Sequence, residues 1–170
     1  YALGQMFYGS LSDCIGRKKV LIPAVALGML GSLLCAYMPH LMSFYAGRIL
    51  QGAGFSAIGA IAPAMGRDAF DDIRFAQIGS ILSMVFGIAP IFSPILGSYI
   101  SHSYGWAVIF YVITVYALLV IMISALWLPE THDTKNRHTF HITAILKTYG
   151  RILKNHMFLK NTFAKSAAYT

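Results

Sequence analysis

The feature that most constrains this chain is a run of 55 residues, Phe75 to Pro129, that contains no Lys, Arg, Asp or Glu. A helix of about 20 residues crosses the hydrocarbon core of a bilayer, so this run is too long for one helix. Its only polar cluster, Ser101 to Gly105, leaves apolar stretches at 75–99 and 106–128. We therefore expect two transmembrane helices joined by a short turn.

Two further stretches of spanning length lie upstream, at 20–38 and at about 44–66, where Arg48 is the only charge. Residues 1–12 are also uncharged, but they would give only about 18 Å of helix against a core of about 30 Å. We expect the chain to begin inside a helix, and residues 157–170 to start another span. The sequence thus predicts an all-α polytopic transmembrane helix bundle.

The composition agrees with a membrane protein. Hydrophobic residues make up 57% of the chain and charged residues 11%, whereas about a quarter of a soluble domain is charged. A net charge of +7 would suggest a nucleic-acid partner for a soluble protein. Here the bases cluster in loops, so we expect no nucleic acid.

The distribution of bases predicts the orientation. The turns at 39–43 and 99–105 hold no Lys or Arg, while the two loops on the other side hold Arg17, Lys18, Lys19, Arg67 and Arg74. Lys and Arg accumulate on the cytoplasmic side of a membrane. The loop around Asp13 and the tail after Glu130 are therefore predicted to be cytoplasmic.

The polar segment at 9–21 joins two apolar helices, which must return through the same membrane face. Gly9 would let another backbone approach closely, and Gly16 can take the positive φ that a reversal needs. Asp13 lies within reach of Arg17, of Lys18 or of a neighbouring helix N-terminus. The alternative is that these are ordinary solvated loop charges.

This segment resembles the pattern G-x-L-x-D-[RK]-x-G-[RK]-[RK] between the second and third helices of the major facilitator superfamily of secondary transporters. Cys14 replaces one base, and the matching residues are Gly9, Leu11, Asp13, Gly16, Arg17 and Lys18. Residues 48–54 resemble the fourth-helix pattern R-x-x-Q-G-x-G, and residues 128–131 resemble the usual exit from the sixth helix.

Residues 89–98 resemble the fifth-helix pattern G-x-x-x-G-P-x-x-G-G of the superfamily's antiporters, with Ala89, Ser93 and Ser98 in place of glycine. The paired prolines here, and the ending of the fourth helix at 66–68, are most similar to the bicyclomycin and chloramphenicol resistance branch of drug/proton antiporters.

Pro90 and Pro94 each remove a backbone donor, so the helix should kink or loosen there. A fixed kink without motion is the alternative. The resemblance implies a seal and hinge that favours exchange over leak, formed by Ala89, Pro90, Ser93, Pro94 and Gly97.

The resemblance also implies a domain organisation, that of helices two to six and the start of helix seven of a twelve-helix protein. Residues 1–128 would be the N-terminal transmembrane half without its first helix, 129–156 a cytoplasmic central loop, and 157–170 the start of the C-terminal half. Within the loop, 142–153 predicts an amphipathic helix on the inner membrane surface, or one packed on a soluble domain, with a basic face of Lys147, Arg151 and Lys154.

We expect a secondary active transporter, a proton-coupled antiporter that exports drugs or other small amphipathic molecules by alternating access. The alternative is a proton-coupled symporter that imports a sugar or organic acid, because a fold does not settle function. Such substrates would need several polar groups at depth. These spans offer mainly Phe, Met and Ile, with Arg48, Gln51 and Gln77 as exceptions.

We do not expect an enzyme, because no Asp or Glu lies within a complete predicted span. We expect no cofactor or metal. No phosphate-cradling glycine loop followed by Lys is present, so we expect the proton gradient, and not ATP, to be the energy source. The expected partners are a small-molecule substrate, protons and the lipid bilayer. The expected location is the bacterial inner (plasma) membrane. We expect the full-length protein to be a monomer and to contribute to multidrug efflux and antibiotic resistance.

Asp13 is expected to act in a cytoplasmic gate that closes the inner side when the transporter faces outward. The gate loop comprises Gly9, Asp13, Gly16, Arg17 and Lys18.

Arg48, with Gln51 and Gly52, is assigned to proton coupling and the cavity. The resemblance implies that Arg48 lowers the pKa of a nearby carboxylate, which we place on the missing first helix. The alternative is an interfacial anchor whose side chain snorkels to water.

Overall fold

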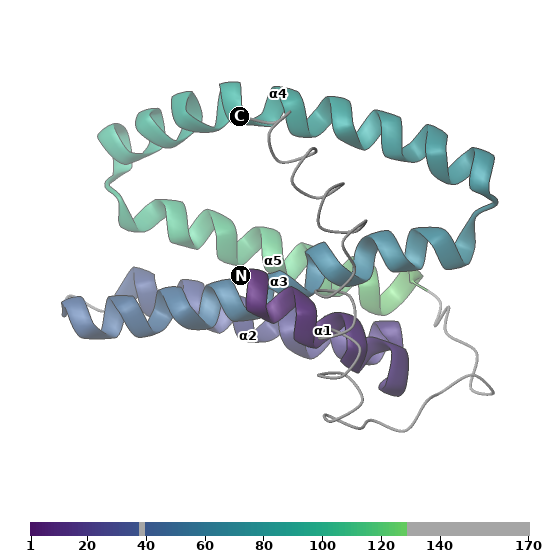
Figure 1. Cartoon of the computed structure of the whole chain (residues 1–170). Coiled ribbons are helices and arrows are strands. Elements are labelled where there is room, and N and C mark those ends of the chain that lie inside the picture. The colour runs from purple at the N-terminus through teal and green to yellow at the C-terminus, as the bar shows by residue number, and fades with distance from the viewer. Residues whose placement is uncertain (38–39, 129–170) are drawn as a thin grey trace, which may run out of the picture. The chain divides into compact units, whose positions relative to one another are not determined.

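The computed structural model describes residues 1–37 and 40–128, and every regular element within them is an α-helix (Figure 1). The helices are α1 (Ala2–Ile15), α2 (Arg17–Tyr37), α3 (Leu41–Ala69), α4 (Asp72–Tyr104) and α5 (Ala107–Trp127). By length and composition, α2 to α5 can each cross a membrane. The predicted all-α transmembrane bundle is confirmed for this part of the chain. The predicted loop at 129–156, its amphipathic segment and the start of a span at 157–170 lie outside the described residues.

Helices α3 and α4 run beyond the apolar stretches predicted at about 44–66 and 75–99, and α2 begins at Arg17 instead of at 20, so two turns are shorter than predicted. Helix α5 stays within the predicted 106–128. Only Gly16, at φ 122°, separates α1 from α2, where the sequence suggested a longer polar loop. Residues 70–71 separate α3 from α4, where a loop over 67–74 was expected. The charged segment at 67–74 contains no Gly or Pro that would break a helix, and its charged side chains can reach water beyond the hydrocarbon layer. The turn predicted before Trp106 is present at Gly105, which has φ 89°.

Close packing of α2 against α3 depends on glycine. A Cβ at Gly31 would lie 2.7 Å from the carbonyl oxygen of Gly47, and one at Gly54 would lie 2.5 Å from the carbonyl oxygen of Ala24. Lipid gives helices no hydrophobic drive to associate, so small residues that permit close backbone packing take over that role. Gly47 and Gly54 of α3 therefore serve its contact with α2.

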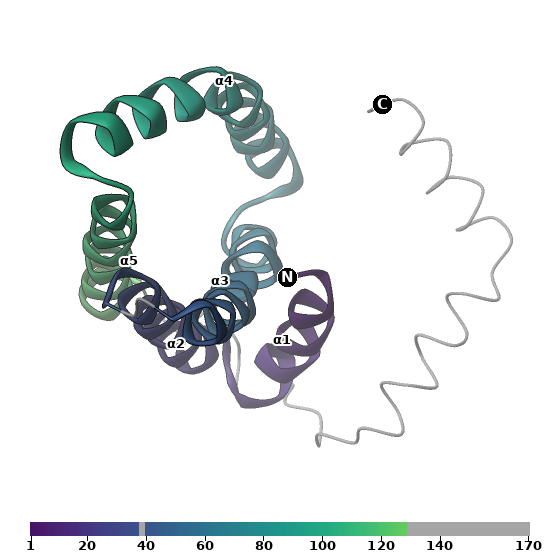
Figure 2. The ribbon, with the colours of Figure 1, turned by 90° about the vertical axis from the view of Figure 1, so that its left-hand side faces the viewer.

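The core lies where α2 meets α3 and α5. Figure 2 looks down the axes of these helices and shows α2 next to both α3 and α5. The buried apolar side chains are Val20, Leu21, Ala24 and Val25 of α2, Ala57, Ile61 and Met65 of α3, and Ala117 of α5. The core is small because glycine and alanine bring the backbones themselves together.

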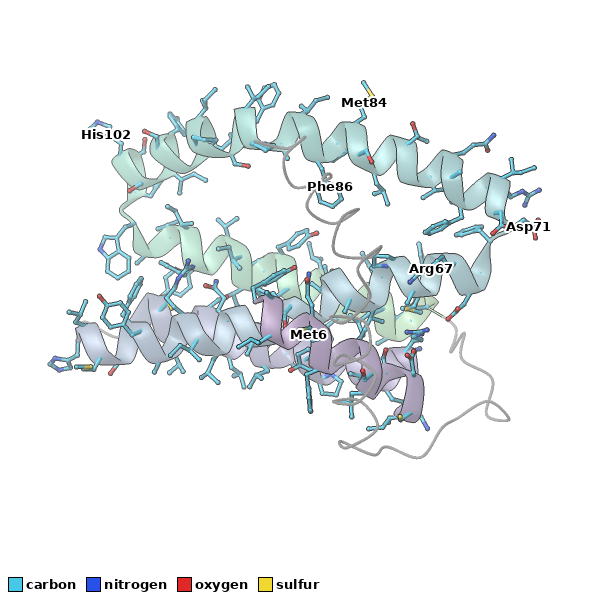
Figure 3. All side chains as sticks on the ribbon, in the orientation of Figure 1. Met6, Arg67, Asp71, Met84, Phe86 and His102 are labelled. Carbon is cyan, nitrogen blue, oxygen red and sulfur yellow. The ribbon has the colours of Figure 1, made fainter. Side chains whose placement is uncertain are left out.

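None of the residues of α4 is buried among the described residues. The helix is continuous through Pro90 and Pro94, and its axis bends between Phe86 and His102 (Figures 2 and 3). The Ser93 hydroxyl donates to the Ala89 carbonyl oxygen at 2.7 Å. Because the two prolines free the carbonyls four residues before them, this bond does not satisfy either freed group. The predicted kink is seen as a bend of the helix axis.

Candidate functional site

Arg17, the first residue of α2, ties the ends of α1 and α3 together. Its Nη1 donates to the Ser12 hydroxyl at 3.1 Å and pairs with Asp13 Oδ1 at 2.8 Å, both on α1. Its Nε donates to Asp68 Oδ2 on α3 at 3.2 Å. The Ser12 hydroxyl in turn donates to the Gly9 carbonyl oxygen at 2.8 Å. One guanidinium thus connects three helices, which a single ammonium could not do with the same geometry.

The members of this network differ in burial. The side chain of Arg17 is 11% exposed, that of Asp68 32% and that of Asp13 49%. A cation at a helix N-terminus opposes the helix dipole, and the two carboxylates offset that cost. Arg17 is therefore held in place, while Asp13 is solvated enough to leave the pair without burying a charge.

Lys18 makes a second contact between helices. Its Nζ donates to the carbonyl oxygen of Ala125 at 2.8 Å, in the last turn of α5. Carbonyls of the last helical turn have no partner within the helix, and a cation there also favours the helix dipole. Lys18 thereby links the α1–α2 turn to the end of α5.

The sequence-based interpretation of this segment holds in part. The positive φ at Gly16 and the position of Asp13 beside Arg17 are as expected. A Cβ added at Gly9 would have no atom of the described residues within 4 Å. Close approach of another helix therefore does not explain this glycine. Asp68 was missed as a partner. The only sequence signal for it was an acid at the end of α3, on the same predicted side as Arg17.

Arg48 begins a second polar group, near the opposite end of α3. Its Nη1 donates to Gln51 Oε1 at 2.6 Å, and Gln51 Nε2 donates to the Ser32 hydroxyl on α2 at 2.9 Å. Ser32 donates to the Gly28 carbonyl oxygen at 3.0 Å. Arg48 is exposed among the described residues, whereas Gln51 is buried and Ser32 fully so.

The two glycines beside Arg48 have different environments. A Cβ at Gly52 would meet no atom of the described residues within 4 Å. Gly47 does not leave space, because a Cβ there would lie 2.7 Å from Cys35 Sγ.

The antiporter-helix residues lie apart from both groups on the surface of α4. Ala89, Pro90, Ser93 and Pro94 are exposed and Gly97 is partly buried. Figure 3 shows the two ends of α4 by Asp71 and His102, with Met84 and Phe86 between them. The predicted role of these residues as a seal and hinge stays a prediction.

Two cavities lie along α3 and α5. The larger, about 540 Å³, is lined by residues that include Leu21, Met65, Phe70 and Val120. The smaller, about 270 Å³, is lined by residues that include Val25, Phe55, Tyr116 and Ala117. Their volumes approach or fall within the range of small-molecule sites, and their walls are mainly apolar.

A family model described as Major Facilitator Superfamily matches residues 1–169. The chain belongs to the major facilitator superfamily. With four helices able to cross a membrane, membership identifies an integral membrane protein. It also agrees with a transport function rather than an enzymatic one.

Individual members of the superfamily give a finer comparison. A "Bicyclomycin resistance protein homolog" of Haemophilus influenzae is 32% identical over 168 residues, which cover 99% of this chain and 42% of the relative. A "Multidrug resistance protein MdtL" of Escherichia coli is 35% identical over 130 residues, which cover 76% of this chain and 33% of the relative. The similarity to the bicyclomycin resistance branch is thus confirmed in sequence.

A solved structure supports the fold. The crystal structure of the human organic anion transporter MFSD10 (TETRAN) matches with a TM-score of 0.71 at 19% identity, over 84% of this chain and 33% of that one. At this identity the likeness concerns the fold alone. The chain spans at most 42% of the length of these three proteins.

Proposed function

We propose that the full-length product of the gene encoding this chain is a proton-coupled antiporter that exports drugs or other small amphipathic molecules by alternating access. The observation that carries the proposal is the low polarity of the described spans. Between their charged ends, Arg48 is the one Lys, Arg, Asp or Glu in α2 to α5 as described, and both cavities have mainly apolar walls. The names of two relatives refer to bicyclomycin resistance and multidrug resistance, which favours the same substrate class.

Proton coupling needs a carboxylate that titrates within the membrane. The described acids, Asp13, Asp68, Asp71 and Asp72, all lie at or near helix ends. We therefore assign the titrating acid to a part of the full-length protein outside the described residues, within reach of Arg48. A nearby positive charge lowers a carboxylate's pKa, so drug and proton compete for one pocket. The proton gradient then drives export without a cofactor. Drug-dependent proton release from inverted membrane vesicles tests this proposal.

The network around Arg17 supports a gate at the turn between α1 and α2. Asp13, its most exposed member, can exchange Arg17 for a partner in another part of the protein. We place this gate on the cytoplasmic side of a bacterial inner membrane, because the described bases at the turns concentrate there. In the outward-facing state it would close the inner side.

Cysteine labelling tests this orientation. In a background without other cysteines, Cys14 should react with a membrane-impermeant maleimide only after permeabilisation. In a second protein that carries Ser101→Cys and Cys14→Ser, the new thiol should react in intact cells. The opposite pattern would overturn both the orientation and the cytoplasmic placement of the gate.

A further inference from the structure

The hydrogen bonds that begin at Arg48 can run in one direction only. A guanidinium has donors and no acceptor, so the atom of Gln51 that faces it must be the amide oxygen. The amide nitrogen then faces Ser32, whose hydroxyl must accept. The proton of that hydroxyl is left for the Gly28 carbonyl oxygen, where the structure has it.

Burial makes this order costly to change. Gln51 is 6% exposed and Ser32 is 0% exposed, so water is not available to replace a lost partner. A buried amide that loses its acceptor loses the hydrogen bond and still bears the free-energy cost of having been removed from water. The Gln51 amide is therefore fixed at both ends, by Arg48 and by Ser32.

The backbones keep Ser32 and Gln51 together. Gly31, directly before Ser32, packs against the backbone nitrogen of Gln51, and a Cβ there would lie 2.9 Å from the Gln51 Cα. A contact between main chains leaves α2 and α3 little freedom to slide. The distance from Ser32 to the Gln51 amide is thus set by helix packing and not by side-chain choice.

We propose that Ser32 is a positioning residue for Arg48: its hydroxyl holds the Gln51 amide in the orientation that presents Oε1 to the guanidinium. This inference rests on the proposed role of Arg48 in proton coupling. Ser32 touches neither proton nor drug. It keeps the guanidinium at the place from which its charge acts on the titrating carboxylate.

The test measures drug transport against pH in the full-length protein. Arg48→Lys should move the acidic limb of the profile to higher pH, because a weaker positive influence lets the acid hold its proton longer. Ser32→Ala should move it in the same direction by about 0.4 to 1 unit, the size of one net hydrogen bond. Ser56→Ala is the matched control, because Ser56 is equally buried and its hydroxyl donates within its own helix to Ala53. It should leave the profile unchanged.

A double variant separates positioning from packing. If Ser32 acts through Gln51, then Ser32→Ala with Gln51→Leu should shift the profile no further than Gln51→Leu alone. The buried Cys35 thiol on α2 lies against Gly47, the residue directly before Arg48. The shift should persist in a Cys35→Ala background. If Ser32→Ala accumulates poorly, Ser32→Cys gives the same comparison, because a thiol is a weak acceptor.

The outcomes distinguish this inference from the proposed function. A wild-type profile for Ser32→Ala beside a shifted Arg48→Lys would overturn the positioning role alone. So would additive shifts in the double variant, or a shift lost in the Cys35→Ala background. A wild-type profile for Arg48→Lys would overturn the coupling role of Arg48 and the positioning role with it.

Discussion

Asp13→Asn is expected to abolish drug export while the amount of protein in the membrane stays near that of the wild type. Asp13 is about half exposed, and its pair with Arg17 joins residues four apart near a helix end. Such a pair contributes only about 0.3 to 0.5 kcal/mol to stability. Arg17 also keeps Ser12 and Asp68 as partners. The variant should therefore fold normally and lose only the charge on which gate closure depends. Export of a fluorescent drug from cells, with immunoblotting of membranes, measures both quantities.

Asp71→Asn is the matched control for this gate variant. Asp71 is an exposed acid at the start of α4, and its side chain makes no capping hydrogen bond. This variant makes the same change in charge as Asp13→Asn, but at an acid outside the Arg17 network. Its export should therefore match the wild type. Full export by Asp13→Asn would reduce the Asp13 loop to a signal for membrane topology.

Arg48→Lys is expected to shift the pH dependence of transport and to lower the drug-induced proton flux at the wild-type optimum. Lysine keeps the charge and can still reach water, but it lacks the planar fork that engages Gln51 and a carboxylate together. The carboxylate's pKa should rise once the guanidinium is lost. Drug binding, which needs the deprotonated acid, should then require a higher pH. A shift of about one unit corresponds to about 1.4 kcal/mol of altered interaction.

The comparison with an interfacial anchor is direct. An anchor needs only a long cationic side chain at that depth, and lysine provides one. If Arg48→Lys matches the wild type at every pH between about 5.5 and 8.5, a range that brackets ordinary titration near neutrality, the coupling role is removed. The anchor interpretation would then account for Arg48.

The sequence predicted the features that depend on the membrane and on local spacing. Apolar runs located α2 to α5, because the bilayer imposes the length of a span. Arg17 was one of the partners expected for Asp13, and the positive φ of Gly16 followed from the need for a reversal. The start of α2 and both ends of α3 and α4 were placed too far inside the helices, because polar and charged residues can continue a helix beyond the hydrocarbon layer.

The contacts between helices could not be predicted in the same way. Arg17 with Asp68, Lys18 with Ala125 and Ser32 with Gln51 join positions 51, 107 and 19 residues apart. Each depends on how a helix is rotated about its own axis. Helices that are apolar on all sides lack the amphipathic pattern that would reveal the rotation.

Proton release from inverted membrane vesicles tests the central claim most directly. In vesicles with an acidified lumen, the outer surface is the cytoplasmic face, and an amphipathic drug added there should enter in exchange for protons. The account predicts an immediate, drug-dependent rise in luminal pH, absent with Asp13→Asn and reduced with Arg48→Lys. A symporter would move protons and substrate in the same direction, so substrate added outside would release none. Drug uptake without proton release, or no response to any amphipathic drug, would contradict the account.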